Sequence, residues 1–121
     1  MRLLLDSDPR INLVRRYDAG VIVIGERQIT RACLVTPQQL LDWSASSIAG
    51  LSEPQLEPLW ALRADIVLLG AGELQQLPSA AIRAAFRDRG IALECMSLGA
   101  ACRTYNILAN EARSVIAGLF P

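Results

Sequence analysis

The stretch ADIVLLGAGELQQLPSAAIRAAFRDRGIALECM, residues 64–96, decides the fold. It opens with a nearly continuous apolar run over residues 64–69, which is typical of a strand buried on both faces. The proline, the serine and the apolar spacing that follow predict a helix over residues 78–89, and a second strand is expected over residues 91–96. A strand, a helix and a strand within about 30 residues predict a βαβ unit with two parallel strands and a right-handed crossover.

The sequence before this unit has the pattern of short antiparallel strands. Segments rich in β-branched residues are expected to form strands at 11–17, 21–24 and 28–35, with a turn signal at 18–20. Short polar turns of this kind join the strands of hairpins, so we predict an N-terminal antiparallel β meander. Residues 1–10 are expected to form a loose arm or a short edge strand.

The middle of the chain carries the weakest pattern. Residues 38–43 are expected to form a short turn of helix that carries Trp43. Residues 44–55 are rich in Ser, Ala and Gly and predict a long loop. Residues 56–63 then have helical spacing around Pro58, which a helix tolerates only near its start.

The C-terminal segment is expected to divide into a helix and a strand. Residues 100–111 contain good helix formers. If the helix ran on to Leu119, its last turns would be apolar on every side, so we predict a break near Ala112 and a strand over residues 113–120. That strand would be apolar on both faces, as a central strand should be. These elements together predict a single α/β domain over residues 1–121.

Composition excludes several classes of chemistry. The chain has 12 basic and 12 acidic residues and no histidine, and every basic residue is arginine. The zero net charge argues against a nucleic-acid-binding protein. Without histidine or lysine, the chain alone cannot form a Ser-His-Asp triad, a histidine-ligated metal site, a Schiff-base lysine or a P-loop lysine. The carboxylates show no spacing that suggests acid–base catalysis, so the residues themselves indicate no reaction.

The cysteines and the N-terminus bear on the compartment. Cys33, Cys95 and Cys102 are odd in number and include no C-x-x-C pair, which favours free thiols in a reducing compartment. Cys102, beside Arg103 at the start of the expected C-terminal helix, is either an activated thiol of a redox protein or a small buried side chain. The spacing resembles no common zinc motif, so neither a metal nor a cofactor is expected. The first residues resemble no signal or transit peptide, and no apolar run approaches the roughly 20 residues that span a bilayer; we expect a cytoplasmic protein that does not span a membrane.

The string MSLGAACRTYNIL, residues 96–108, with Glu111 and Arg113 after it, resembles a family of small uncharacterised bacterial and archaeal proteins. That family also includes a mitochondrial assembly factor of respiratory complex I, namely assembly factor three of the NADH dehydrogenase alpha subcomplex. Arg103-Thr104-Tyr105-Asn106 carries the most specific part of the likeness. Further matches spread it over nearly the whole chain, at Tyr17, Gly20, Pro37, Trp43 and residues 68–72. One departure is Ala112, where the family usually has a glycine that ends the helix; we expect alanine to end the helix in another way.

The resemblance implies both a fold and a role. The family fold has three layers and a mixed central sheet whose last strand runs antiparallel to its neighbours. The mitochondrial branch implies a non-catalytic assembly or accessory factor that acts through protein contacts, including contacts with an assembly intermediate of a membrane complex. No catalytic residue can be carried over from the family. Tyr105, Glu111 and Arg113 are the motif residues that the resemblance makes candidates for such contacts.

The expected topology also supports a different class of function. Ligands of open α/β sheets bind at the carboxyl ends of parallel strands, and here two such strands end in small residues at 70–72 and 97–99. The amino end of the C-terminal helix would face the same edge and favour an anion. The alternative is therefore a small anion-binding domain or an enzyme. Its candidate ligand-binding residues are Gly70, Gly72, Ser97, Gly99, Arg103, Thr104 and Asn106.

Each of these residues also has a purely structural interpretation, and the sequence leaves both open. The glycines can serve only tight turns, and Arg103 can pair with Glu73 or Glu111. Tyr105 and Asn106 can orient a ligand, or they can pack in the core and bind backbone. We expect protein partners in the first class of function and a small anionic ligand in the second.

Overall fold

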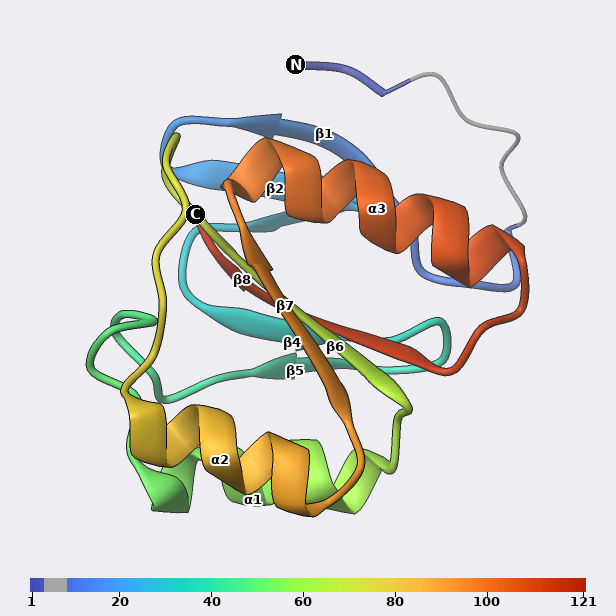
Figure 1. Cartoon of the computed structure of the whole chain (residues 1–121). Coiled ribbons are helices and arrows are strands. Elements are labelled where there is room, and N and C mark those ends of the chain that lie inside the picture. The colour runs from blue at the N-terminus through green and yellow to red at the C-terminus, as the bar shows by residue number, and fades with distance from the viewer. Residues whose placement is uncertain (4–8) are drawn as a thin grey trace.

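A five-stranded mixed sheet forms the middle layer of the protein (Figure 1). The structure is a computed structural model that describes residues 1–3 and 9–121. The strands of the central sheet, in order across it, are β5 (Leu40–Asp42), β4 (Cys33–Val35), β8 (Val115–Phe120), β6 (Ile66–Ala71) and β7 (Ala92–Met96).

The other two layers cover the two faces of this sheet. Helices α1 (Glu53–Leu62) and α2 (Ala80–Asp88) lie against one face, and α3 (Leu98–Asn110) lies against the other (Figure 1). A three-stranded antiparallel sheet shares the layer of α3. Its strands are β1 (Val14–Asp18), β2 (Val21–Ile24) and β3 (Arg27–Ile29). The predicted three layers and the predicted meander are therefore confirmed, and two apolar cores form, one on each side of the central sheet.

The predicted βαβ unit is present. Strands β6 and β7 pair in parallel, from Ile66 opposite Ala92 to Gly70 opposite Met96. The Ser79 side chain accepts a hydrogen bond from the backbone N–H of Ile82 and so begins α2. A second crossover, through α3 on the opposite face, leads from β7 to β8.

Strand β8 is buried along its whole length, because all six of its residues are buried. It runs antiparallel to β4 and parallel to β6. The resemblance implied that this last strand runs antiparallel to both neighbours. That expectation is confirmed for the neighbour β4 and is wrong for the neighbour β6. The reason is the α3 crossover, which returns the chain so that β8 points the same way as β7 and β6.

Two expectations for the middle of the chain are wrong. The single strand expected over residues 28–35 is two strands, β3 and β4, which belong to different sheets. Residues 38–43 form no helix; they contain β5, which pairs antiparallel with β4. The turn between β4 and β5 is closed by the Thr36 hydroxyl, which accepts hydrogen bonds from the N–H groups of Gln38 and Gln39.

Two other segments differ in their limits. Helix α1 begins inside the loop expected at 44–55, because Gln55 Oε1 accepts from the backbone N–H of Ser52 and caps the first turn. Pro58 therefore lies inside the helix and not near its start, and the buried side chains of Leu56 and Leu59 hold that helix in place. Of the expected N-terminal arm, Arg2 forms a single antiparallel bridge with β1, while residues 4–8 lie outside the described part of the chain.

Helix α3 ends near Ala112, as predicted, but by the geometry that a glycine would use. Ala112 has a φ of 58°, in the left-handed region. Its N–H donates to the carbonyl of Ala109, and the N–H of Arg113 donates to the carbonyl of Leu108. These two bonds are the Schellman pattern of a helix end. The expectation that alanine must end the helix in another way is therefore wrong, and the chain carries the steric cost of a Cβ in this conformation.

We expect Ala112→Gly to stabilise the protein. The left-handed conformation costs a non-glycine residue about 1–2 kcal/mol, and the greater freedom of glycine in the unfolded chain returns about 0.4–1 kcal/mol of that. The net gain in the free energy of unfolding should be about 0.5–1 kcal/mol, measured by urea denaturation. The matched control is Ala81→Gly at an exposed position of α2, which should lose about 0.5–1 kcal/mol. Equal losses in both variants would contradict this account of the helix end.

Candidate functional site

Asn106 in α3 is bound to the backbone of β1. Its Nδ2 donates to the carbonyl oxygen of Val14 at 2.8 Å, and its Oδ1 accepts from the N–H of Val14 at 2.9 Å. Both residues are buried. The side-chain amide thus offers Val14 one donor and one acceptor, as a neighbouring strand would. Asn106 was expected either to orient a ligand or to bind backbone, and the structure shows that it binds backbone.

Tyr105 makes a second connection to the same segment. Its ring is fully buried, and its hydroxyl donates to the carbonyl of Asn12 at 2.7 Å. Burial raises the pKa of this hydroxyl above its ordinary range, so the group stays protonated as a donor. Asn12 itself donates from its backbone N–H to Pro37 and from Nδ2 to Thr36, which ties the segment to the turn after β4.

Arg103 makes the third connection, at the surface. Its Nη1 donates to the hydroxyl of Tyr17 at 2.9 Å. The Tyr17 ring lies so close to Gly99 that a Cβ there would stand 2.8 Å from Cζ. Among the described residues, Arg103 forms no ion pair with Glu73 or Glu111.

These connections form one unit, which we call the α3–β1 clamp. It consists of three residues of α3 and three residues of the segment before and within β1. The members are Arg103, Tyr105 and Asn106 on the helix, and Tyr17, Asn12 and Val14 opposite them. Of the four-residue motif that carries the resemblance, three side chains therefore hold the N-terminal meander against the C-terminal helix.

A cleft lies at the predicted edge of the central sheet. Strands β6 and β7 end side by side there. Just beyond their ends, the N–H of Leu98 donates to the carbonyl of Gly72 at 2.9 Å. The cleft has a volume of about 650 Å³ and is lined in part by four of the candidate ligand residues. These are Gly72, Ser97, Gly99 and Arg103.

The electrostatic character of this cleft is mixed. Arg103 and the amino end of α3 favour an anion, although Ser97 Oγ already accepts from the N–H of Ala100 in the first turn. Glu73 and Asp18 share the lining. Asp18 pairs with the chain's amino group at 2.8 Å, and this hydrogen bond lowers the pKa of its exposed carboxyl. Arg103 is therefore the one arginine among the lining residues, and two carboxylates accompany it.

The remaining ligand candidates lie elsewhere. Gly70 is under α3, where a Cβ would stand 2.3 Å from the Cβ of Ala101, so the glycine permits close packing of helix on strand. Thr104 is half-buried in α3 and does not line the cleft. Asn106 is engaged in the clamp. The structure thus brings together four of the seven candidates.

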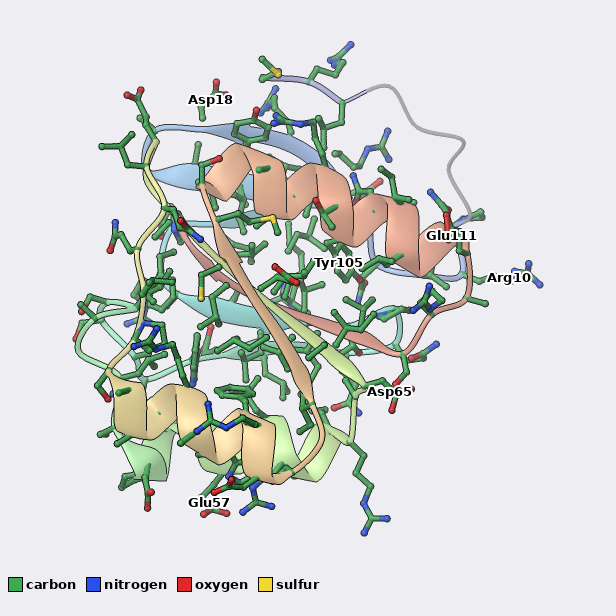
Figure 2. All side chains as sticks on the ribbon, in the orientation of Figure 1. Arg10, Asp18, Glu57, Asp65, Tyr105 and Glu111 are labelled. Carbon is green, nitrogen blue, oxygen red and sulfur yellow. The ribbon has the colours of Figure 1, made fainter. Side chains whose placement is uncertain are left out.

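The three interaction candidates are not side by side. Tyr105 is in the core, whereas Glu111 and Arg113 are exposed where α3 ends. Figure 2 shows Glu111 at that end of α3, with Asp18 near the opposite end. Arg113 lines a second hollow, of about 430 Å³, near the start of β8. Glu111 and Arg113 therefore belong to a surface separate from the cleft.

Cys102 is a small buried side chain rather than an activated thiol. It is fully buried in α3, and this burial raises the pKa of its thiol to about 12 although Arg103 is its neighbour. The pKa of Cys33 rises to about 12 for the same reason. Thiols with such pKa values are almost entirely protonated near neutral pH, so the structure does not support a redox role for Cys102.

Metal ligation and membrane spanning find no support in the part of the chain that the structure describes. No group of three or more cysteine, aspartate or glutamate side chains is arranged there to hold a metal ion. No helix in that part has both the length and the apolar character needed to cross a bilayer.

The fold and the clamp define a class: small three-layer α/β proteins whose C-terminal helix is fastened to an N-terminal meander. The chain belongs to the family described as Protein of unknown function (DUF498/DUF598), whose model matches residues 14–120. A solved structure of a Xanthomonas campestris protein is 33% identical, with a TM-score of 0.83, and the match covers 98% of this chain and 92% of that one.

Two relatives of known name are also similar. NADH dehydrogenase [ubiquinone] 1 alpha subcomplex assembly factor 3 of Bos taurus is 29% identical over 121 residues, which cover 98% of this chain and 66% of the relative. This chain therefore spans just under two thirds of the assembly factor's length. The 13 kDa major membrane protein of Francisella tularensis is 27% identical over 103 residues, with 84% of each chain covered.

Replacing Asn106 should test how much the clamp stabilises the fold. Asn106→Ala removes two hydrogen bonds and leaves the buried N–H and carbonyl of Val14 unpaired, so we expect a loss of about 2–4 kcal/mol in the free energy of unfolding. The control is Asn110→Ala, at an exposed position of the same helix, which should change stability by less than about 0.5 kcal/mol. Urea denaturation measures both. Hydrogen exchange at the Val14 amide should accelerate in Asn106→Ala alone, and unchanged exchange there would show that the clamp is dispensable.

Proposed function

We propose that this protein is a non-catalytic accessory factor that binds other proteins during the assembly of a larger complex, including a membrane complex. The observation that carries the proposal is the alignment of 98% of the chain with a respiratory complex I assembly factor. The clamp agrees with it, because Tyr105 and Asn106 are occupied within the fold and are not free to act on a substrate. In this role the chain works in the cytoplasm and contacts its partner through its surface.

The surface at the end of α3 is our first candidate for that contact. Glu111 and Arg113 are exposed and belong to the motif that carries the resemblance. Opposite charges at this spacing offer a partner two complementary contacts, which favour specificity and fast association.

Capture from native membranes and extract tests this function. The tagged wild-type chain should recover a protein partner, and the molar ratio of partner to tagged chain should be the same in repeated captures. The double variant Glu111→Arg with Arg113→Glu keeps the net charge and should recover at most about a tenth as much. Glu57→Arg, on the exposed surface of α1, is the control and should recover as much as wild type. If the wild-type chain recovers no partner in repeated trials, the proposed function is wrong. If the double variant recovers as much partner as wild type does, the partner binds at a surface other than the end of α3.

A second candidate function is the binding of a small anion in the cleft. The observation that favours it is the meeting of Gly72, Ser97, Gly99 and Arg103 at one hollow of about 650 Å³. The mixed charge of the lining suits a ligand that carries a carboxylate or phosphate together with a donor group for Glu73.

A thermal-shift series tests the cleft, with inorganic phosphate and small carboxylates as probes. A ligand present at 100 times its Kd stabilises the folded state by about 2.7 kcal/mol, so a bound probe should raise Tm clearly. Arg103→Ala should abolish the rise, whereas Arg31→Ala, an exposed arginine outside the cleft, should keep it. No shift in the wild-type chain, or the same shift in Arg103→Ala, would count against an anion site here.

A further inference from the structure

Strand β7 is an outer strand of the central sheet and has a partner on one side only. It pairs with β6, and no described strand lies on its other side (Figure 1). An outer strand presents unpaired backbone groups that can bind another extended chain.

The hydrogen-bond pattern identifies the free groups. The N–H of Ala92 donates to Asp65 on the side of β6. Because the direction alternates along a strand, the backbone groups of Leu93 and Cys95 point outward. The carbonyl of Cys95 accepts instead from Gln75 Nε2 at 2.9 Å, which confirms that it points away from β6. Among the described residues, the N–H and carbonyl of Leu93 and the N–H of Cys95 have no hydrogen-bond partner and form an open edge.

A groove runs along this open edge, between β7 and α2. It has a volume of about 560 Å³, and the partly buried side chains of Ile91 and Leu93 contribute apolar surface to it, above the buried ring of Phe86. Leu77 also lines it and is 49% exposed, while Leu74 in the same loop is 79% exposed. An extended chain on β7 would cover Leu77, Ile91 and Leu93, which line the groove.

The charges in the groove select the kind of chain that fits. Arg83 and Arg87 on α2 line it, and Glu94 is the one carboxylate among the lining residues. Acidic side chains on an incoming strand would therefore meet two arginines. A second copy of this chain fits less well, because a two-fold β7–β7 pair would bring the arginines of both α2 helices together, and the register centred on Glu94 would oppose two carboxylates.

We propose that the outer edge of β7 binds an extended segment of a partner protein, as an added strand, with apolar side chains in the groove and acidic side chains on Arg83 and Arg87. This inference rests on the proposed function, since it names a surface through which an accessory factor holds its partner. Gln75 regulates access, because its side chain must leave the Cys95 carbonyl before that group can pair with the added strand.

A titration with a defined peptide tests the edge. The probe is a blocked eight-residue peptide with threonine at every odd position and valine and glutamate in turn at the even positions, which places valine and glutamate on the same face of the added strand. The control peptide has lysine in place of glutamate. On the 15N-labelled chain, the acidic probe should shift the amide resonances of Leu93 and Cys95 and slow their hydrogen exchange at least tenfold. The lysine peptide should do neither.

Variants separate the edge from a general charge effect. Arg83→Glu with Arg87→Glu should weaken binding of the acidic probe about tenfold or more. Arg31→Glu with Arg63→Glu makes the same charge change at exposed arginines that do not line the groove and should leave the affinity within about twofold. Gln75→Ala removes a competing hydrogen bond and should tighten binding about fivefold.

Three results would overturn the proposal. They are an absence of protection at Leu93 and Cys95 with the acidic probe, equal binding of the lysine peptide, and a concentration-dependent dimer that protects the same amides without any peptide. Capture from native extract distinguishes a failure of the β7-edge proposal from a failure of the proposed accessory function. If Arg83→Glu with Arg87→Glu recovers the partner as well as wild type does, the edge is wrong and the accessory role stands. If wild type recovers nothing while the peptide binds, the accessory role is wrong and the edge stands.

Discussion

The pairing of the Asn106 amide with the Val14 backbone is the interaction on which the arrangement of the layers depends. A buried strand edge must satisfy its N–H and carbonyl groups, and water cannot do so here because both residues are buried. Asn106 supplies both partners from a residue 92 positions away. The amide has one donor side and one acceptor side in a fixed plane, so it sets the distance and the orientation of α3 relative to β1. The hydroxyl of Tyr105 and the guanidinium of Arg103 then act on a segment that is already in register.

The glycines of the central sheet serve the same requirement for close approach. Gly70 allows α3 to lie directly on β6, since a Cβ there would meet Ala101. On the other face, Gly118 leaves room for the ring of Trp43, which in turn contacts Phe120 with ring centroids 5.3 Å apart. A glycine at the end of a strand can admit a ligand or admit the protein's own helix, and the sequence signal is the same in both cases. The structure separates them, because Gly72 lines the cleft and Gly70 does not.

The parts of the fold that local pattern determines were predictable, and the parts set by distant contacts were not. The βαβ unit and the buried strand at the C-terminus follow from apolar runs and a helix start that lie close together in the sequence. The change of sheet within 28–35 does not, because alternation continues through it and only the contact with β8 separates β3 from β4. At the site, the resemblance singled out Arg103, Tyr105 and Asn106. Their partners Asn12 and Val14 carry no local signal, since the bonds to them span more than 90 residues.

The structural role of the motif also limits what the resemblance transfers. A motif that fastens α3 to β1 serves the fold whatever the partner is, so sharing it predicts the fold better than the function. Specificity must then come from surface groups other than the buried bonds of the clamp. Three surfaces present such groups, and they differ in chemistry. The cleft has one arginine, shared with the clamp, and two side-chain carboxylates; the end of α3 has two exposed side chains of opposite charge; and β7 has an open backbone edge beside two arginines. The edge of β7 offers a row of backbone groups that must be paired whenever water is excluded, so a partner bound there gains directional bonds as well as apolar contact.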